Sequence, residues 1–313
     1  MGPAAGRAGA AHPGHPGAVR AGAVVSAPTL EVVRAGLLST VQDLGRPGLA
    51  HLGVPRSGAA DPDALRLANR LVGNPEGLAA IETTLLGVDV RLAAGRWVAV
   101  TGAPAPVQIA GRPAGGCCAQ YAPAGAVVSV GPAVAGVRSY LAVAGGIDVA
   151  PELGSRSTDT LGGLGPPVLR AGAVVPLGAA RAAPAPIDVA PQPCVPEPAA
   201  LRLVPGPRDD WFGPGSLADL VGGAYRVTPA ADRVGVRLAG PRLTARRGAG
   251  LPSEGVVRGA VQVPPGGEPI VFLADHPTTG GYPVVGVVHP GDLWLVAQAR
   301  PGTRIRFRWH RAG

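Results

Sequence analysis

Residues 253–283 have the sequence SEGVVRGAVQVPPGGEPIVFLADHPTTGGYP. Two short apolar runs, at 259–263 and 269–273, are bounded by glycine, proline or polar residues, and a third run begins at 283. Runs of this length between tight-turn residues are typical of short antiparallel strands rather than of amphipathic helices. The stretch therefore predicts a β structure whose strands follow one another closely.

Comparable apolar runs recur along most of the chain. Strands that are this short and frequent favour closed antiparallel barrels over a parallel α/β sheet. One helix is clearly signalled, because Asp61 is a good N-cap, Pro62 occupies the first helical position and Gly73 ends the run. Shorter helices are expected over 216–221 and 292–300. The remaining expected strands lie at 30–38, 97–101, 107–110, 126–130, 138–143, 201–204, 233–238, 283–288 and 303–309.

Two stretches of low complexity divide the chain. Residues 1–27 and 179–199 are rich in Ala, Gly and Pro and show no apolar period, so we predict a disordered tail and an extended interdomain linker. Two folded domains are then expected, at 28–178 and 200–311. The 313 residues, 46% of them hydrophobic, suffice for two domains of ordinary size.

The charge composition excludes several kinds of chemistry. All 28 basic residues are Arg, because the sequence contains no Lys, and the net charge is +8. A P-loop lysine, a Schiff-base lysine and a biotin-carrying lysine are therefore impossible on these residues. The arginines are scattered singly among acidic residues, so we do not expect nucleic-acid binding.

The cysteines and the hydropathy pattern bear on metal binding and location. Cys117, Cys118 and Cys194 lack metal-ligand spacing, so no metal is expected, and their odd number favours a reducing compartment. The sequence contains no apolar run of about 18 residues, which argues against a membrane span. Residues 1–27 also lack the apolar core of a secretory signal. We therefore expect a cytoplasmic protein.

Four segments carry a resemblance to a known family. They are TVQDLGRPGLAHLGVPRSGAADPDALRLANRLVGNP at 40–75, YLAVAGGIDVAPELGSRSTDT at 140–160, ADRVGVRLAGP at 231–241, and the segment at 253–283. Their order and spacing resemble the biotin-dependent carboxyltransferase family. This family includes the C-type subunit of 5-oxoprolinase, proteins called allophanate hydrolase subunit 2 or kinase-inhibitor antagonists, and part of urea carboxylase. The sequence departs from the family pattern at Ala231, Val236, Ala239 and His276.

The resemblance implies a mainly β fold of two cyclophilin-like β-barrel domains with a few short helices. It implies the C-type subunit of an ATP-dependent 5-oxoprolinase, which hydrolyses the small-molecule substrate 5-oxo-L-proline to L-glutamate together with A-type and B-type subunits. ATP is then expected to bind with or on the partner subunits. Two alternatives stay open: a biotin-dependent carboxyltransferase acting on urea or a related amide, and a non-catalytic antagonist that binds the B-type, kinase-inhibitor-like homologue.

Opening a lactam requires donors that stabilise an anion, a general acid or base, and a site that excludes water. The first two segments supply polar side chains around tight turns, and an arginine fork there could bind a carboxylate or phosphate. Alternatively, these residues pair with one another to fix their loops. The candidates for substrate or anion binding are Gln42, Asp43, Arg46, Arg56, Ser155, Arg156 and Ser157.

The segment at 253–283 supplies the catalytic candidates. Glu254 or Asp275 could serve as general base, with Thr279 and Tyr282 as orienting groups. The glycines of the following loop let backbone N–H groups approach a ligand closely. The alternative is a plain turn that Asp275 caps. Further binding candidates in this segment are Gln262, Thr278, Gly280 and Gly281, whereas Asp232 and Arg233 are expected to form an ion pair with each other.

Overall fold

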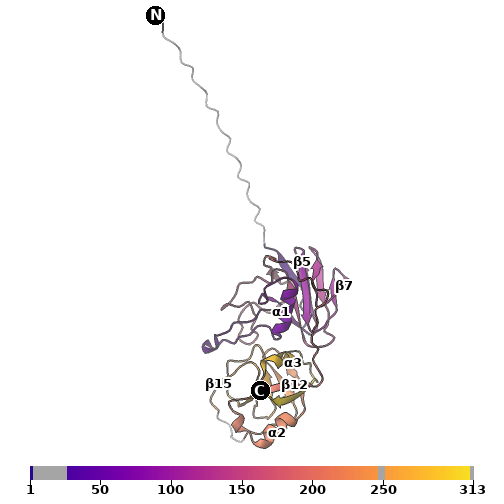
Figure 1. Cartoon of the computed structure of the whole chain (residues 1–313). Helices are drawn as coiled ribbons and strands as arrows, with labels where there is room; N and C mark the ends of the chain where they lie inside the picture. The colour runs from indigo at the N-terminus through magenta and orange to yellow at the C-terminus, as the bar shows by residue number, and fades with distance from the viewer. Residues whose placement is uncertain (3–26, 246–250, 311–313) are drawn as a thin grey trace.

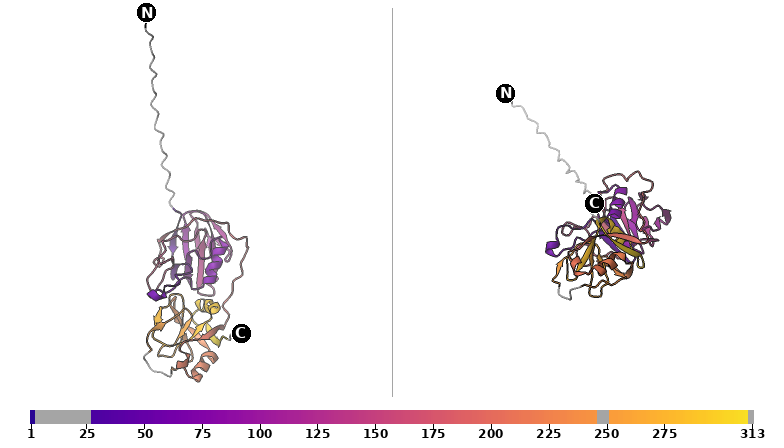
Figure 2. Two further views of the ribbon diagram at one scale, coloured as in Figure 1. Left: turned by 60° about the vertical axis from the view of Figure 1, so that its left-hand side comes forward. Right: turned by 60° about the horizontal axis from the view of Figure 1, so that its bottom comes forward.

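We describe a computed structural model of the protein, in which residues 1–2, 27–245 and 251–310 are described. The predicted tail at 1–27 falls almost entirely outside these residues. The chain forms two parts, one stacked on the other in Figure 1. The segment between them, residues 177–198, runs along one side of the molecule (Figure 2). It contains neither helix nor strand.

The first part contains two sheets, and all their strand pairs are antiparallel. The six-stranded sheet has the order β11 (Val174–Pro176), β1 (Thr29–Arg34), β4 (Val88–Leu92), β9 (Val127–Val130), β6 (Val107–Ile109) and β7 (Arg112–Ala114). The five-stranded sheet has the order β2 (Leu38–Gln42), β3 (Ala80–Thr84), β10 (Arg138–Val143), β5 (Arg96–Gly102) and β8 (Gln120–Ala122). Leu30 and Val90 from one sheet share a core with Ile81 and Leu141 from the other.

Helix α1 (Pro62–Leu71) covers the other face of the five-stranded sheet. Asp61 caps it as predicted, because its side chain accepts a hydrogen bond from the backbone N of Ala64. Leu65 and Leu71 of the helix pack in one cluster with Tyr140 of β10. All six residues of β10 are therefore buried, since this strand is covered on both faces. A short 3₁₀ turn, η1 (Ala50–Leu52), precedes the helix.

The second part is a closed barrel. Its strand order is β12 (Ala199–Pro205), β19 (Val284–Val288), β16 (Ala260–Gln262), β17 (Ile270–Phe272), β14 (Gly235–Ala239), β13 (Tyr225–Ala231) and β20 (Arg304–Trp309). Only the β12–β20 pair among these is parallel. The short pair β15 (Glu254–Gly255) and β18 (Thr279–Gly280) lies outside the barrel. The helices and turns of this part are η2 (Asp209–Trp211), α2 (Pro214–Gly222), η3 (Pro290–Asp292) and α3 (Leu293–Ala297).

The predicted mainly β class with a few short helices is confirmed, and the second part contains a barrel of the expected kind. The first part arranges its strands as two facing sheets. The strand expected over 30–38 is divided into β1 and β2 at Gly36, whose φ of +65° places it in the left-handed region. A Cβ at Gly36 would lie 2.0 Å from the carbonyl oxygen of Gly87, so only glycine fits this break.

Candidate functional site where the two parts meet

Asp275 is the point at which the predicted segments come together. It follows β17 and is completely buried. Its Oδ1 accepts a hydrogen bond from Ser57 Oγ at 2.7 Å, and its Oδ2 accepts from Thr160 N at 3.0 Å and from Thr160 Oγ1 at 2.7 Å. Because Ser57 and Thr160 belong to the first part, this carboxylate joins both of their loops to the barrel.

Arg233 of the barrel supplies the charge that Asp275 requires. Its Nε and Nη2 donate to the two oxygens of Asp275 at 2.9 and 2.8 Å, a bidentate pair. Its Nη1 also pairs with Glu82 of β3, whose other oxygen accepts from Tyr140 Oη at 2.7 Å. The side chains of Arg233, Asp275 and Glu82 are each 1% exposed or less. We call Glu82, Arg138, Arg233 and Asp275 the interface ion cluster, since Arg138 lies 3.6 Å from Glu82.

The interface ion cluster keeps its carboxyl groups ionised. Burial alone would raise the pKa of Asp275, but Arg233 outweighs burial and holds the pKa below its usual range. Glu82 follows the same balance, with its pKa lowered by Arg233 and Arg138 against the effect of burial. The prediction that Arg233 pairs with Asp232 is wrong. Asp232 Oδ1 instead accepts from the backbone N of residues 234 and 235 in a tight turn, which also delays the expected strand at 233 until Gly235.

Asp43 organises the second predicted segment. Its Oδ1 accepts from Ser155 Oγ at 2.6 Å and Ser157 Oγ at 2.5 Å, and its Oδ2 accepts from the backbone N of Arg156 at 2.7 Å. Gln42, one residue earlier, donates from Nε2 to the carbonyl of Thr158 at 2.9 Å. The first two segments are thus joined by hydrogen bonds, although Asp43 is bound by serine hydroxyls and backbone N–H groups and, within the described residues, forms no ion pair with the arginines.

The three arginines of these segments have different surroundings. Arg46 is 1% exposed and donates from Nη2 to Ser157 O at 2.6 Å; within the described residues its Nε and Nη1 have no hydrogen-bond partner. Arg56 is exposed, with Nε 3.3 Å from Leu44 O. The side chain of Arg156 is bound to Asp148 at 2.7 Å. Of the three, Arg56 is therefore the one open to solvent.

The third segment forms a small exposed tip beside this junction. Glu254 of β15 pairs in register with Gly280 of β18 and binds Arg208 through both oxygens. The hydrogen bond from Arg208 lowers the pKa of Glu254. Thr279 and Gly281 are exposed, Thr278 is partly buried, and Tyr282 is 47% exposed. Gln262, buried on β16, donates to Tyr282 O at 3.1 Å and so holds the tip.

Two further groups at this junction escaped prediction from the sequence. Arg258 donates to the carbonyl oxygens of Ala59 and Ala60, and among the described residues it forms no ion pair. Its pKa is lowered mainly by burial and further by Arg233 and Arg56. His276 is buried beside Asp275, and burial lowers its pKa, so its ring is neutral at pH 7. Arg258 therefore offers a small anion a cation whose hydrogen bonds, within the described residues, go to backbone carbonyl groups.

Among residues 1–2, 27–245 and 251–310, no group of three or more His, Cys, Asp and Glu side chains could hold a metal ion. Within the same ranges, no helix is long and apolar enough to cross a membrane.

Fold and site together define a two-part β protein whose polar groups meet between a pair of sheets and a barrel. The family described as carboxyltransferase domain, subdomain A and B, matches residues 52–309. The chain belongs to this family, which confirms the resemblance found in the four segments.

Individual relatives agree with this assignment. The chain is 36% identical over 281 residues to the C subunit of 5-oxoprolinase from Escherichia coli (strain K12), covering 89% of this chain and 90% of the relative. It is 33% identical over 310 residues to urea amidolyase of Saccharomyces cerevisiae, covering 89% of this chain and only 16% of the relative. The crystal structure of TTHA0988 is 42% identical, with a TM-score of 0.83 over 90% of this chain; the chain spans 56% of that protein.

Proposed function

We propose that this chain is the C-type subunit of an ATP-dependent 5-oxoprolinase and hydrolyses 5-oxo-L-proline to L-glutamate together with homologues of the A-type and B-type subunits. The observation that carries the proposal is the match to the E. coli protein, which spans 90% of that relative as well as 89% of this chain. A match over nearly the whole of both proteins supports an equivalent subunit, whereas the urea amidolyase match covers one region of a much longer chain. The free cysteines suit the reducing cytoplasm in which we place the complex.

The substrate 5-oxoproline carries one carboxylate, which a cation at the junction can bind. Arg258 and Arg56 are the cations that we assign to this group, since Arg258 lacks an acidic partner among the described residues and Arg56 is exposed. The hydroxyls of Thr279 and Tyr282, on the exposed tip, are the groups that we assign to orient the lactam. The backbone N–H groups of Gly280 and Gly281 are candidates to stabilise the developing oxyanion.

The two carboxylates predicted as general bases are assigned positioning roles instead. Asp275 and Glu254 are each bound by an arginine that lowers the carboxyl pKa. A carboxylate with a low pKa is a poor proton acceptor at neutral pH. Asp275 therefore holds the loops of both parts in register, and Glu254 anchors the tip through Arg208.

The nucleotide and biotin belong on other chains in this proposal. Phosphate-binding loops use a lysine that this sequence lacks, so we place ATP on the partner subunits. Biotin is carried on a lysine, so the carboxyltransferase alternative requires a separate carrier as well. That alternative is favoured by the family's description and by the urea amidolyase relatives. The antagonist alternative requires only that the chain binds the B-type homologue.

The test is co-expression with the neighbouring A-type and B-type homologues, followed by an assay of glutamate release from 5-oxoproline with and without ATP. We expect release that depends on ATP and on this chain. Arg258→Met should raise KM about tenfold or more, since an interaction with a charged group is worth about 1.5–3 kcal/mol. The matched control is Arg237→Met, because Arg237 is exposed on β14. No release from an assembled complex refutes the proposal, and carboxylation of urea by that complex with a biotin carrier would establish the alternative.

A further inference from the structure

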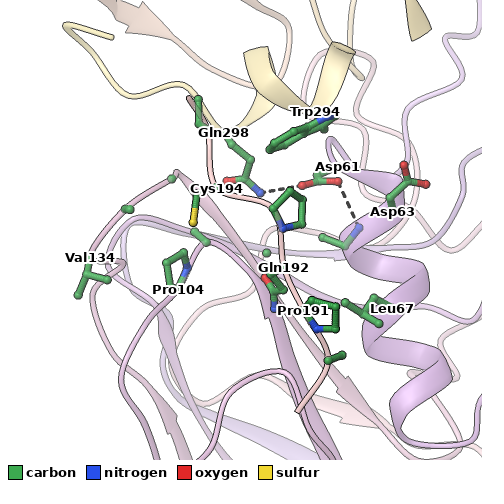
Figure 3. Close-up of a pocket in the computed structure, with 18 of the residues that line it drawn as sticks. Asp61, Asp63, Leu67, Pro104, Val134, Pro191, Gln192, Cys194, Trp294 and Gln298 are labelled. Atoms are coloured by element: carbon green, nitrogen blue, oxygen red, sulfur yellow. Dashed lines mark hydrogen bonds between the residues drawn. The ribbon is translucent and has the colours of Figure 1, made fainter. Parts of the chain in front are cut away.

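A cavity of about 760 Å³ is lined by Asp61, the residue after Ala60, whose carbonyl oxygen accepts from Arg258. It is enclosed by α1, the start of α3, the loops at 102–104 and 134–136, and the connecting segment at 187–197 (Figure 3). None of the residues predicted from the sequence to form the functional site lines it. Its volume is in the range of small-molecule sites, about 300–1,000 Å³.

The walls of the cavity are mainly apolar. Leu67 of α1, Pro104 and Val134 face Pro191 of the connecting segment, and the indole of Trp294 closes one end (Figure 3). The side chain of Val134 is 69% exposed. Such walls suit an apolar or aromatic ligand body.

One charged group on the wall forms no ion pair among the described residues, although the charge of Arg258 acts on it at longer range. Asp61 is 5% exposed, accepting from Ala64 N at 3.2 Å and from Gln298 Nε2 at 2.9 Å, and no cation within the described residues forms an ion pair with it. Burial raises the pKa of Asp61, and the charges of Asp63 and Glu82 raise it further. Capping α1 does not require this charge, since asparagine or serine caps a helix equally well.

The other charged groups on the wall are already engaged. Asp63 binds Arg66, Arg70 binds Glu76, and Glu197 binds Arg304. Arg300, the last of them, donates to the carbonyl oxygens of residues 133 and 136. Asp61 is therefore the charge that a ligand could neutralise, and a buried carboxylate beside an indole attracts a cation.

We propose that this cavity binds a small amphiphilic organic cation, with its apolar body against the aliphatic walls and its ammonium group against Asp61 beside Trp294. This binding is separate from the proposed 5-oxoprolinase function, so either can fail without the other. The proposal uses an existing opening, and it places a cation in direct contact with Asp61, whose interaction with Arg258 is not a salt bridge.

The test uses three probes with one body and different charge: 4-phenylbutylamine, 4-phenylbutanol and 4-phenylbutyrate, titrated into the full chain by calorimetry. The amine should bind about tenfold or more tightly than the alcohol, and the carboxylate most weakly, because a hydrogen bond to a charged group contributes about 1.5–3 kcal/mol. Asp61→Asn keeps the cap and should reduce amine affinity to that of the alcohol. Asp63→Asn is the matched control, since the side chain of Asp63 is 82% exposed and should change little.

A second readout places the probe. Cys194 is exposed and lines the cavity, whereas Cys118 is buried elsewhere. The amine should slow alkylation of Cys194 by iodoacetamide, mapped by mass spectrometry. If Asp61→Asn fails to fold, the relative affinities of the three probes and the protection of Cys194, both measured in the unchanged protein, still test the proposal. Equal binding of the three probes, no saturable binding of any, or unprotected Cys194 would overturn the proposal.

Discussion

Replacement of Arg233 by methionine tests the interface ion cluster directly. Methionine keeps the apolar stem of the arginine but removes the cation from between Asp275 and Glu82. Glu82 still has Arg138 at 3.6 Å, so it can remain ionised. Asp275 keeps only the neutral donors of Ser57 and Thr160 and is left as a buried charge with no counter-ion.

The expected loss in the free energy of unfolding depends on whether Asp275 stays ionised without a partner or becomes protonated. Breaking a buried ion pair by removing one partner costs about 3–5 kcal/mol. Protonating a carboxyl group of ordinary pKa at pH 7 costs about 4 kcal/mol. The destabilisation caused by one unpaired carboxylate therefore cannot exceed about 4 kcal/mol, because the group can be protonated instead. Since Glu82 retains a partner, we expect Arg233→Met to reduce the free energy of unfolding by about 4 kcal/mol at pH 7.

The loss should shrink in acid. In the unchanged protein the pKa of Asp275 is lowered, so its contribution to stability is present above the unfolded pKa and is lost only as pH falls through the lower folded value. In the variant, burial without Arg233 raises this pKa, so Asp275 destabilises the fold until it is protonated. The difference between the two proteins should therefore fall to about 1.5 kcal/mol at pH 5.

Urea unfolding at pH 7 and pH 5, followed by circular dichroism, measures both values. The matched control is again Arg237→Met, an exposed arginine, which should change stability by less than about 0.5 kcal/mol at either pH. A loss below about 1 kcal/mol at pH 7, or a loss that does not diminish in acid, would show that the cluster does not support the junction as described.

Three further predictions concern single positions. Asp43→Asn should cost about 2 kcal/mol and speed hydrogen exchange at 155–157, because an amide cannot accept from all the donors that Asp43 serves; unchanged exchange there would contradict the role of Asp43. Gly87→Ala should cost at least about 2 kcal/mol in thermal unfolding, as its φ is +72° and a Cβ would lie 1.9 Å from Val130 O. Gly111→Ala, at φ +76° but in open space, should cost only about 1 kcal/mol. Glu254→Gln should leave the shape of the pH–rate profile of the assembled complex unchanged from pH 5 to 9, since the pKa of Glu254 is lowered; a lost inflection near neutrality would identify Glu254 as the base.

Local signals in the sequence predicted the elements that depend on neighbouring residues. The helix after Asp61 was predictable because the cap, the proline and the closing glycine all lie within it or beside it. The strand expected at 138–143 forms with those bounds, and its last four residues, 140–143, are a continuous run of apolar and aromatic side chains. Strand β3 was not predicted, because Glu82 interrupts its apolar pattern. That residue is tolerated in the core through Arg138 and through Arg233, which lies 151 positions later.

The candidate site was predictable as segments but not as contacts. The segments at 40–75, 140–160 and 253–283 do meet, at Asp275. The partners of Asp275 lie 42, 115 and 218 positions away in the chain, and no local pattern encodes such distances. Arg233 was assigned to its neighbour Asp232 because adjacent opposite charges suggest a pair, whereas the turn at Asp232 directs the two side chains to different partners. The roles predicted for Thr279 and Tyr282 stay predictions, as do the positioning roles that we propose for Glu254 and Asp275 in place of the general-base roles expected from the sequence.

The interface ion cluster also constrains how this protein can change over time. Glu82, Arg233 and Asp275 come from distant parts of the gene, yet each balances the charge of another in a place that water does not reach. A single mutation at any of them leaves an uncompensated charge, so a lineage can abandon the cluster only through several mutations together. Homologues that have lost the arginine should therefore have lost an acidic partner too, and the two halves of the gene should be difficult to exchange between distant members of the family.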